Sequence, residues 1–231
     1  MELGEAIRGT GAVRQFTDEV IDDTTVHALL DDARFAPSGG NRQGWRIVVV
    51  KDPTIRAELG RLMRPVWDEY VAIGATGVTP FSSVPDSGGT PASAKSIPPE
   101  LAGGIPNDIL DNIVDIPVVL VIAADLSLIA MMDRDLDRKP IAGGASIYPF
   151  CWNLLLAARS RGLGGVLTTF LARAEPQAAP LLALPDGYAI AGMVFLGRPV
   201  HQPTRLKREP VSSFTTIDTF AGPAFHIEGQ T

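Results

Sequence analysis

The sequence predicts a single α+β domain in which apolar strands alternate with amphipathic helices. Of its 231 residues, 45% are hydrophobic and 20% are charged, which is the composition of an ordinary globular protein. Residues 116–124 form a continuous apolar run, typical of a strand buried on both faces. Apolar residues keep helical spacing over residues 53–72 and 145–161. We therefore expect one domain over residues 1–231.

Local start and stop signals delimit the predicted elements. Asp52 followed by Pro53 is a typical helix start, and Gly162 can end the apolar helix before it, whose last turn carries two arginines. Helices are thus expected at residues 3–8, 24–35, 53–72, 107–114, 145–161 and 175–184. Strands are expected at residues 47–50, 116–124, 166–170 and 189–196.

Two segments depart from this regular pattern. Residues 74–106 are rich in Gly, Pro, Ser and Thr, and a loop of this length is usually a lid, a binding loop or disordered. We expect an insert that covers the substrate side of a pocket, with disorder as the alternative. An extended C-terminal tail is expected at about residues 203–231.

Charge, apolar run length and cysteine content exclude several classes of protein. The formal net charge of −6 argues against a nucleic-acid surface, and the nine-residue run 116–124 is too short to span a bilayer. The acidic start contains no signal-peptide pattern, so we expect a cytoplasmic protein. The single cysteine, Cys151, rules out an internal disulfide and is expected to be a packed thiol. The three histidines lack metal-ligand spacing, so no metal site is expected.

The turn between the second predicted helix and the first strand is unusually polar. Residues 36–45 read Ala-Pro-Ser-Gly-Gly-Asn-Arg-Gln-Gly-Trp. Pro37 cannot continue a helix, and the two glycines allow a positive φ or a close approach to another group. The residues alone leave two interpretations open, a ligand loop and an ordinary polar turn.

Residues 37–45 resemble the Pro-Ser-x-x-Asn-x-Gln-Pro-Trp loop of the FMN-dependent nitroreductase family, with Gly44 in place of the usual proline. In that family the loop runs along the isoalloxazine ring and ribityl chain of FMN. The resemblance implies a set of cofactor-binding residues: Pro37, Ser38, Gly39, Asn41 and Gln43.

The second match follows the long apolar helix. The segment Arg159 to Gly164 is similar to the family's Arg-x-x-Gly-Leu-Gly, after which a strand carries backbone amides to the N5 and O4 edge of the flavin. The resemblance places Gly164, Gly165, Leu167 and Thr168 at that edge. On propensity alone the threonines of this strand are equally well explained as ordinary β-forming residues.

The segments that correspond to the phosphate-binding elements of the family match it less completely. Residues 206–210 resemble its Lys-Arg-x-Pro element, which implies that Lys207 and Arg208 bind the FMN phosphate; a solvated basic cluster is the alternative. Arg14 matches the last arginine of the family's Arg-(x)-Ser-x-x-Arg, but residues 10–12 replace the first arginine and the serine. Arg8, or a nest of backbone amides at residues 9–12, could act instead.

The resemblance implies a three-layer α-β-α sandwich with a central mixed, mostly antiparallel sheet. It also implies a homodimer with its sites at the subunit interface, FMN as cofactor, and NADPH or NADH as reductant. The acceptor would be a nitroaromatic, a quinone or another electron-poor small molecule, reduced by ping-pong hydride transfer through flavin N5. Because a flavin carries its own redox power, no catalytic residue is expected. A flavin-dependent reductive dehalogenase and a non-enzymatic flavin-binding or sequestering protein are the alternatives.

Overall fold

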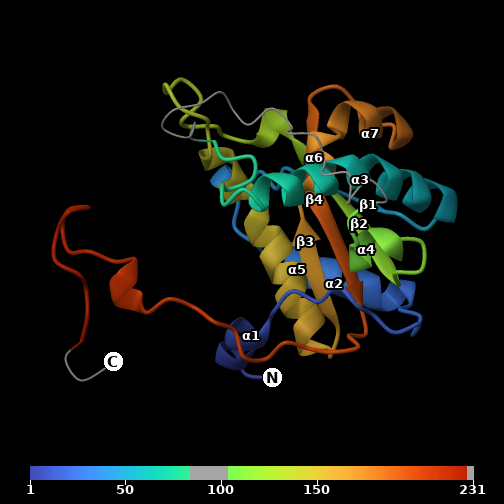
Figure 1. Ribbon diagram of the computed structural model, residues 1–231, viewed down its shortest axis with the longest axis horizontal. Coiled ribbons are helices and arrows are strands. Elements are labelled where there is room, and N and C mark those ends of the chain that lie inside the picture. Colours follow the sequence, from blue (N-terminus) through green and yellow to red (C-terminus); the bar gives the residue numbers. More distant parts are fainter. Residues whose placement is uncertain (84–103, 228–231) are drawn as a thin grey trace.

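The computed structural model describes residues 1–83 and 104–227, and its described strands form one antiparallel sheet in the order β1-β2-β4-β3 (Figure 1). The four strands are β1 (Trp45–Val49), β2 (Val118–Asp125), β3 (Gly164–Thr168) and β4 (Tyr188–Gly197). All three ladders are antiparallel, and an isolated parallel bridge joins Ala12 to Gly165 beside β3. The strands β1 and β3 are therefore the two edges of the sheet.

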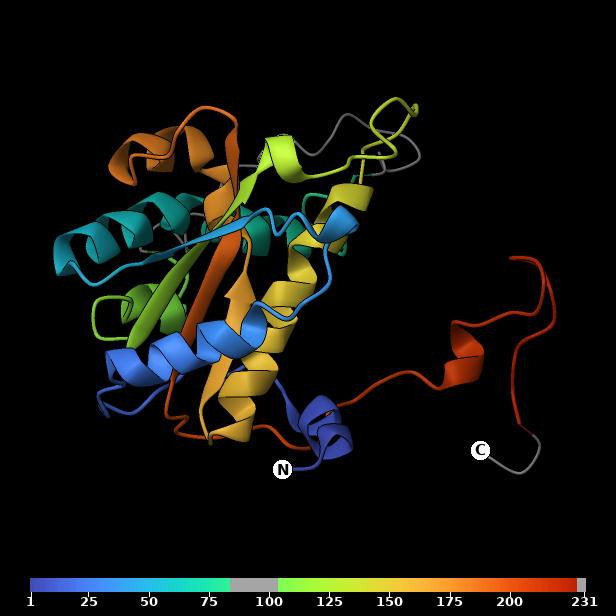
Figure 2. The same ribbon diagram turned by 180° about the vertical axis from the view of Figure 1, so that it is seen from behind.

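Helices cover both faces of this sheet (Figures 1 and 2). One face packs against α2 (Asp23–Ala33) and α5 (Tyr148–Ser160), and α1 (Leu3–Gly9) contacts α5. The other face packs against α3 (Pro53–Gly74), α4 (Asp108–Asp111), α6 (Phe170–Arg173) and α7 (Glu175–Leu181). The predicted three-layer sandwich with a mostly antiparallel sheet is confirmed.

The central strand β2 supplies both hydrophobic cores, as its continuous apolar sequence predicts. Leu120 and Ile122 belong to the cluster on the α2/α5 side, whereas Val119 and Val121 belong to the cluster on the opposite side. All four side chains are fully buried. Alternate residues of a strand point to opposite faces, so a strand placed between two helical layers must be apolar throughout.

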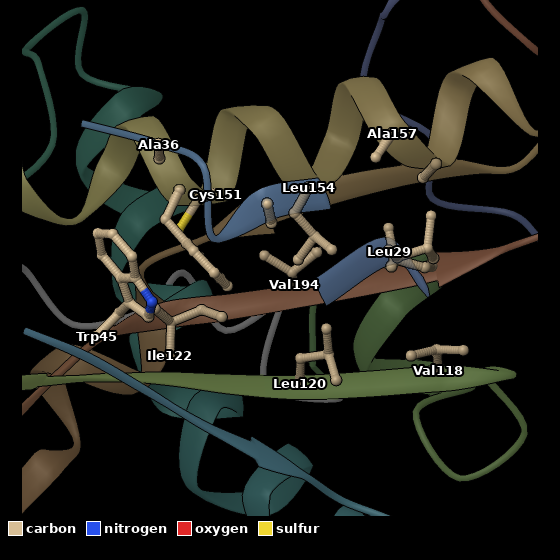
Figure 3. Packing of buried hydrophobic residues seen from close by; sticks show 14 of the residues in the cluster. Leu29, Ala36, Trp45, Val118, Leu120, Ile122, Cys151, Leu154, Ala157 and Val194 are labelled. Atoms are coloured by element: carbon tan, nitrogen blue, oxygen red, sulfur yellow. The ribbon is translucent and has the colours of Figure 1, made fainter. Parts of the chain in front are cut away.

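Figure 3 shows the core on the α2/α5 side, where α5 lies along the sheet. Leu154 and Cys151 of α5 are fully buried there, and Trp45 stacks on Phe150 with a ring-centroid distance of 5.1 Å. Burial raises the pKa of the Cys151 thiol to about 12, so the thiol is protonated at neutral pH. The prediction of a packed thiol is confirmed.

Helix α5 ends as predicted but begins later than predicted. Gly162, at φ +74°, donates its N–H to Arg159 O (3.1 Å), and Leu163 donates to Ala158 O (2.9 Å), which is a Schellman end. At the other end a 3₁₀ turn, Ala142–Ser146, precedes the helix, which starts beside Pro149. Proline is favoured in the first helical turn because its missing N–H would have no partner there.

Other boundaries also differ from the predictions, and the helix predicted at 175–184 ends at Leu181. The predicted strand 166–170 starts at Gly164 and ends at Thr168, and Phe170 begins α6. Strand propensity favoured Phe170, but the buried Leu171 of the same short helix anchors this segment in the core below α3. The helix predicted at 107–114 spans only Asp108–Asp111. Asn107 is its N-cap, and the backbone leaves the helical conformation at Asn112, with φ −123° and ψ 14°.

The predicted insert at residues 74–106 and the C-terminal tail are each described only in part. Residues 84–103 of the predicted insert lie outside the described residues, so the lid prediction is untested. Beyond Leu206, which packs against Gly11, the described tail runs away from the helical layers and the sheet (Figures 1 and 2). Within the described ranges, every helix is too short or too polar to cross a bilayer.

Candidate functional site

The loop between α2 and β1 has a strained and tightly bonded backbone. Gly40, Asn41 and Gln43 have φ values of +61°, +53° and +52°, and only glycine adopts this region without cost. The Ser38 hydroxyl accepts a hydrogen bond from the Gln43 amide (2.9 Å), and Gln43 Nε2 donates to Asn41 Oδ1 (3.3 Å). Apart from the half-buried Ser38, residues 37–43 are exposed. Strain held in place on an exposed loop is typical of a functional segment.

A buried serine ties this loop to the start of α5. The Gly39 amide donates to Ser146 Oγ at 3.1 Å, and Ser146 is only 8% exposed. Ser146 ends the 3₁₀ turn that leads into α5. The predicted residues Pro37, Ser38, Gly39, Asn41 and Gln43 therefore lie at the N-terminal end of α5.

Asp133 in turn holds the beginning of that 3₁₀ turn. Its carboxylate accepts hydrogen bonds from the amides of Ile141 (2.8 Å) and Ala142 (3.1 Å) and from Arg138 Nη1 (2.6 Å). The Ile141 amide, together with these other donors, lowers the pKa of Asp133 to about 2. The support for the loop thus depends on an ionised carboxylate.

At the β3 edge of the sheet, opposite β1, close packing explains why residues 164 and 165 are glycines. A Cβ on Gly165 would lie 2.6 Å from Phe195 O, and a Cβ on Gly164 would lie 2.6 Å from Val13 Cγ2. The Val13 amide donates to Gly165 O at 2.9 Å. Glycine is thus needed at position 164 for the N-terminal segment to lie against β3, and at position 165 for the close approach of β4, whether or not a ligand binds.

A cavity of about 450 Å³ opens between this edge, α3 and α4. Three predicted residues, Arg14, Leu167 and Thr168, line it together. The other lining residues are Trp67, Tyr70, Asn107, Ile109, Leu110, Val166, Thr169 and Phe170. Thr168 Oγ1 is buried and has no hydrogen-bond partner among the described residues, which is uncommon for a buried hydroxyl.

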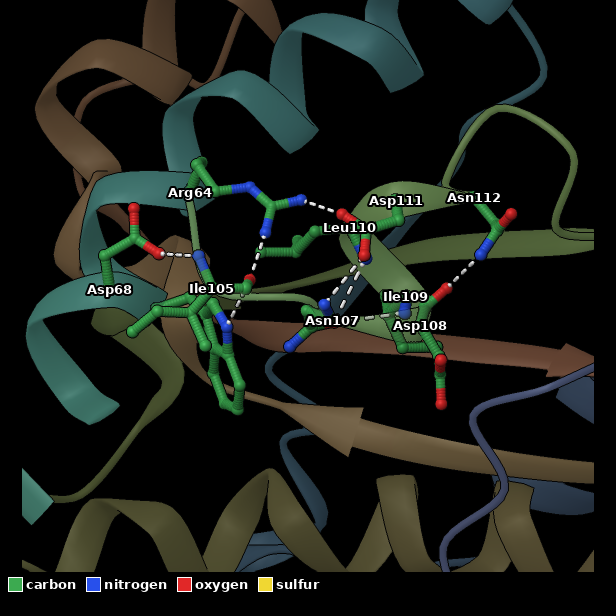
Figure 4. A network of polar contacts seen from close by, with 10 residues as sticks. Arg64, Asp68, Ile105, Asn107, Asp108, Ile109, Leu110, Asp111 and Asn112 are labelled. Atoms are coloured by element: carbon green, nitrogen blue, oxygen red, sulfur yellow. Dashed lines mark hydrogen bonds and ion pairs between the residues drawn. The ribbon is translucent and has the colours of Figure 1, made fainter. Parts of the chain in front are cut away.

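Asn107 is a lining residue that the sequence analysis missed. Its Oδ1 accepts the amides of Ile109 (3.0 Å) and Leu110 (3.1 Å) at the start of α4 (Figure 4). This cap fixes the orientation of the side-chain amide, so its NH₂ group points away from the helix end and is available as a donor. The sequence shows only a helix-capping residue, because its place beside β3 depends on contacts between distant segments.

The two basic residues of the tail lie outside the cavity. Lys207 and Arg208 are exposed, and Arg208 Nη1 donates to the carbonyl of Lys207 (2.7 Å). The residue before them, Leu206, packs against Gly11, where a Cβ would lie 2.9 Å from Leu206 Cδ2. The tail therefore leaves the body of the protein next to the segment that carries Arg14.

The structure does not bring all predicted site residues together within one chain. The loop 37–43 precedes β1, whereas the cavity adjoins β3, and these strands are opposite edges of the sheet. Three interstrand spacings separate them by about 14 Å. No residue of the loop lines the cavity.

The charge of the cavity favours an electron-rich ligand edge. Arg14 is a cation, Asn107 and the edge-strand amides are donors, and none of the described lining residues is acidic. Within the described ranges, no three His, Cys, Asp or Glu side chains are placed to hold a metal ion. Fold and site together define an α+β protein with a cavity that offers hydrogen-bond donors and the cation of Arg14 to a ligand.

A sequence model of the nitroreductase family matches residues 7–198, and the chain belongs to this family of oxidoreductases. Solved structures agree on the fold. Nitroreductase A from Vibrio parahaemolyticus is 21% identical, with 94% of this chain and 75% of that chain covered and a TM-score of 0.65. The NADPH:FMN oxidoreductase from Vibrio harveyi, complexed with NAD⁺, is 21% identical, with 94% of this chain and 76% of that chain covered and a TM-score of 0.65. A BluB-like flavoprotein from Clostridium difficile is 19% identical, with 95% of this chain and 100% of that chain covered and a TM-score of 0.66.

The Asp133 contacts generate a prediction about pH. Because the pKa of Asp133 is lowered from 3.8 to about 2 on folding, its ionised form stabilises the protein fully above about pH 4. This contribution is lost as the pH falls toward 2. Asp133→Asn should therefore unfold at a lower urea concentration than the unmodified protein at pH 7, with a difference that shrinks below pH 4. Asp135→Asn, at an exposed neighbouring carboxylate, is the control and should show no such change. An equal difference at pH 7 and pH 3 would contradict the assignment.

Proposed function

We propose that this oxidoreductase is an FMN-dependent NAD(P)H oxidoreductase that binds the flavin in the cavity between β3, α3 and α4. The observation that carries the proposal is the donor set of that cavity: Arg14, the oriented amide of Asn107 and the unpartnered hydroxyl of Thr168. β3 is an edge strand, so part of its backbone amides face away from β4. These groups suit the polar edge of an isoalloxazine ring.

Bound FMN would supply two-electron hydride transfer, while the chain supplies binding and electrostatics. Arg14 would place positive charge at the pyrimidine end of the ring, where a reduced flavin is anionic. Lys207 and Arg208 would hold the phosphate. In the net reaction NAD(P)H, a proton and a quinone give NAD(P)⁺ and a hydroquinone. A nitro group takes up the same hydride and proton and gives a nitroso group and water.

A second copy of the chain would complete the site. The loop 37–43 lies at the β1 edge of the sheet, away from the cavity of its own chain. It would therefore reach the cavity of a partner copy. Helix α5 exposes Tyr148 (43%) and Trp152 (41%), which are four residues apart on one helical face and suit a helix-to-helix interface. The tail exposes large apolar side chains that its own domain does not cover: Val211, Phe214, Ile217, Phe220 and Phe225. A homodimer would bury both surfaces.

The alternatives keep the flavin but change its use. A reductive dehalogenase would use the same cavity, and the free Thr168 hydroxyl is compatible with it. A flavin store would bind FMN but would not turn over. Since NADH and NADPH are intracellular reductants, we expect the protein to work in the cytoplasm, on a small-molecule acceptor.

The purified protein should be yellow, with the visible absorbance of oxidised FMN at one flavin per chain. Anaerobic addition of NADPH or NADH should bleach this absorbance, and a quinone or nitroaromatic acceptor should restore it. Because one slot serves the reductant and the acceptor in turn, steady-state kinetics should give parallel double-reciprocal plots. Slow bleaching would favour a flavin store, and a colourless protein that takes up no FMN would contradict the proposal.

Removing a phosphate contact should weaken FMN binding. Arg208→Ala should raise the dissociation constant of FMN by about tenfold, the usual scale for a charge-assisted hydrogen bond. The effect is measured by fluorescence titration of the apoprotein. Arg61→Ala, an exposed arginine paired with Glu58 on α3, is the control and should leave the constant unchanged. Equal affinity of Arg208→Ala and the unmodified protein would exclude this phosphate contact.

A further inference from the structure

The guanidinium of Arg159, in the last turn of α5, has no partner among the described residues. Its Nε is buried and unbonded, and its terminal nitrogens, which are not enclosed, form neither a hydrogen bond nor an ion pair there. Arg161, the C-cap of the same helix, pairs with Asp32 at 2.7 Å and donates to Ala157 O at 3.2 Å. A half-buried cation without an anion is costly, because nothing replaces its lost hydration. The environment of Arg159 thus favours an anionic ligand.

This guanidinium lies beside the segment that joins α1 to Arg14. A Cβ on Gly9 would lie 3.7 Å from Arg159 Nη2 and 4.0 Å from Arg159 Nε. Helix α1 contacts α5 near the end of α5 that leads into β3 (Figures 1 and 2). Further along, a parallel bridge joins Ala12 to Gly165 of β3. One short stretch of backbone therefore runs from Arg159 to the cavity that Arg14 lines.

The tail packs on the same segment. A Cβ on Gly11 would lie 2.8 Å from Pro203 Cβ and 2.9 Å from Leu206 Cδ2. Lys207 and Arg208 follow directly and are exposed. Neither of these two cations forms an ion pair with a described residue. Unpaired cations from α5 and from the tail are therefore placed next to one stretch of backbone.

The groups that the sequence offered for this place are engaged elsewhere or have the wrong conformation. Arg8 folds back along α1, since its Nη1 would lie 3.0 Å from a Cβ on Gly4. Gly9 and Gly11 both lack the positive φ that an αR-αL nest of amides requires. The Thr10 hydroxyl donates to a carbonyl of α1 at 2.6 Å, so its proton is already used. An anion beside this segment would therefore depend on side chains from α5 and the tail.

We infer that Arg159 binds the phosphate of FMN together with Lys207 and Arg208, and that it makes the site selective for a phosphorylated flavin. The inference rests on the proposed function, since it adds a residue to the same cofactor site. A guanidinium presents two parallel N–H donors to a phosphate, which makes such pairs strong and directional. Because the Nε side of Arg159 is enclosed by packing, this side chain loses less freedom on binding than the exposed tail cations.

The length of the intervening backbone suits this assignment. Gly9 lies beside Arg159, Arg14 lines the cavity, and five extended residue steps span at most about 18 Å. The ribityl chain would run along this backbone, from a ring in the cavity to a phosphate at the end of α5. Since Arg14 is the one cation among the described lining residues, the phosphate needs further cations beyond the cavity.

Comparison of FMN with riboflavin tests this inference apart from turnover, because the two flavins differ only in the phosphate. Fluorescence titration of the apoprotein gives both dissociation constants, and their ratio is the phosphate preference. Arg159→Met removes the charge but keeps a long side chain in the same place. It should lower the preference about tenfold, by weakening FMN binding while riboflavin binding stays within about twofold. Arg161→Met, in the same turn, is the matched control and should leave the preference unchanged.

The two flavins also separate a phosphate contact from a structural role. An unchanged preference in Arg159→Met would overturn the inference, and so would an equal loss of affinity for both flavins, which is the result of general damage to the fold. Arg159→Gln is neutral but polar, should show the same loss, and decides the question if Arg159→Met does not fold. An unmodified protein that binds neither flavin contradicts the proposed function. FMN binding whose preference is independent of Arg159 contradicts this inference alone.

Discussion

The burial of α5 against β2 and β4 is the interaction on which the two halves of the site depend. Its inner face, with Phe150, Cys151 and Leu154, is fully or almost fully buried in the core below the sheet. The N-terminal end of this helix holds the loop 37–43 through Ser146, and its C-terminal end leads through a Schellman turn into β3. Helix α5 thus connects the two segments, since the loop is bonded to its start and β3 follows its end.

The opposite edges of the sheet separate the two groups of residues that we propose to form the cofactor site. The donors near β3 form one group, and the strained loop before β1 forms another on the far edge of the sheet. An exposed aromatic stripe on the outer face of α5 would let two copies pack through this helix, with each copy bringing its loop to the other's cavity. Its buried inner face makes α5 a core helix, and the exposed Tyr148 and Trp152 would make it an interface helix in the proposed dimer.

Local chemistry made much of the fold predictable. The helix start at Asp52 and Pro53, the helix end at Gly162 and the two-sided burial of β2 follow from capping, backbone freedom and side-chain periodicity. The start of α6 at Phe170 was missed because strand propensity competes there with a tertiary contact of Leu171. For the site, the sequence pointed to Arg14, Leu167 and Thr168 through a family resemblance, and the structure brings these three to one cavity. Asn107, Trp67 and Tyr70 were missed because their neighbours are distant in sequence, and each reads locally as a cap or a core residue.

The central claim is that each site combines the cavity of one copy with the loop of another. A mixing experiment tests this claim most directly. Arg14→Glu would disable the cavity and Ser38→Trp would block the loop, so each variant alone should bind no FMN. If two copies share each site, half of the randomly mixed dimers carry one intact site of two, and co-expression should restore about a quarter of the FMN content. Co-expression that restores no FMN, while each variant remains folded and dimeric, would contradict the account.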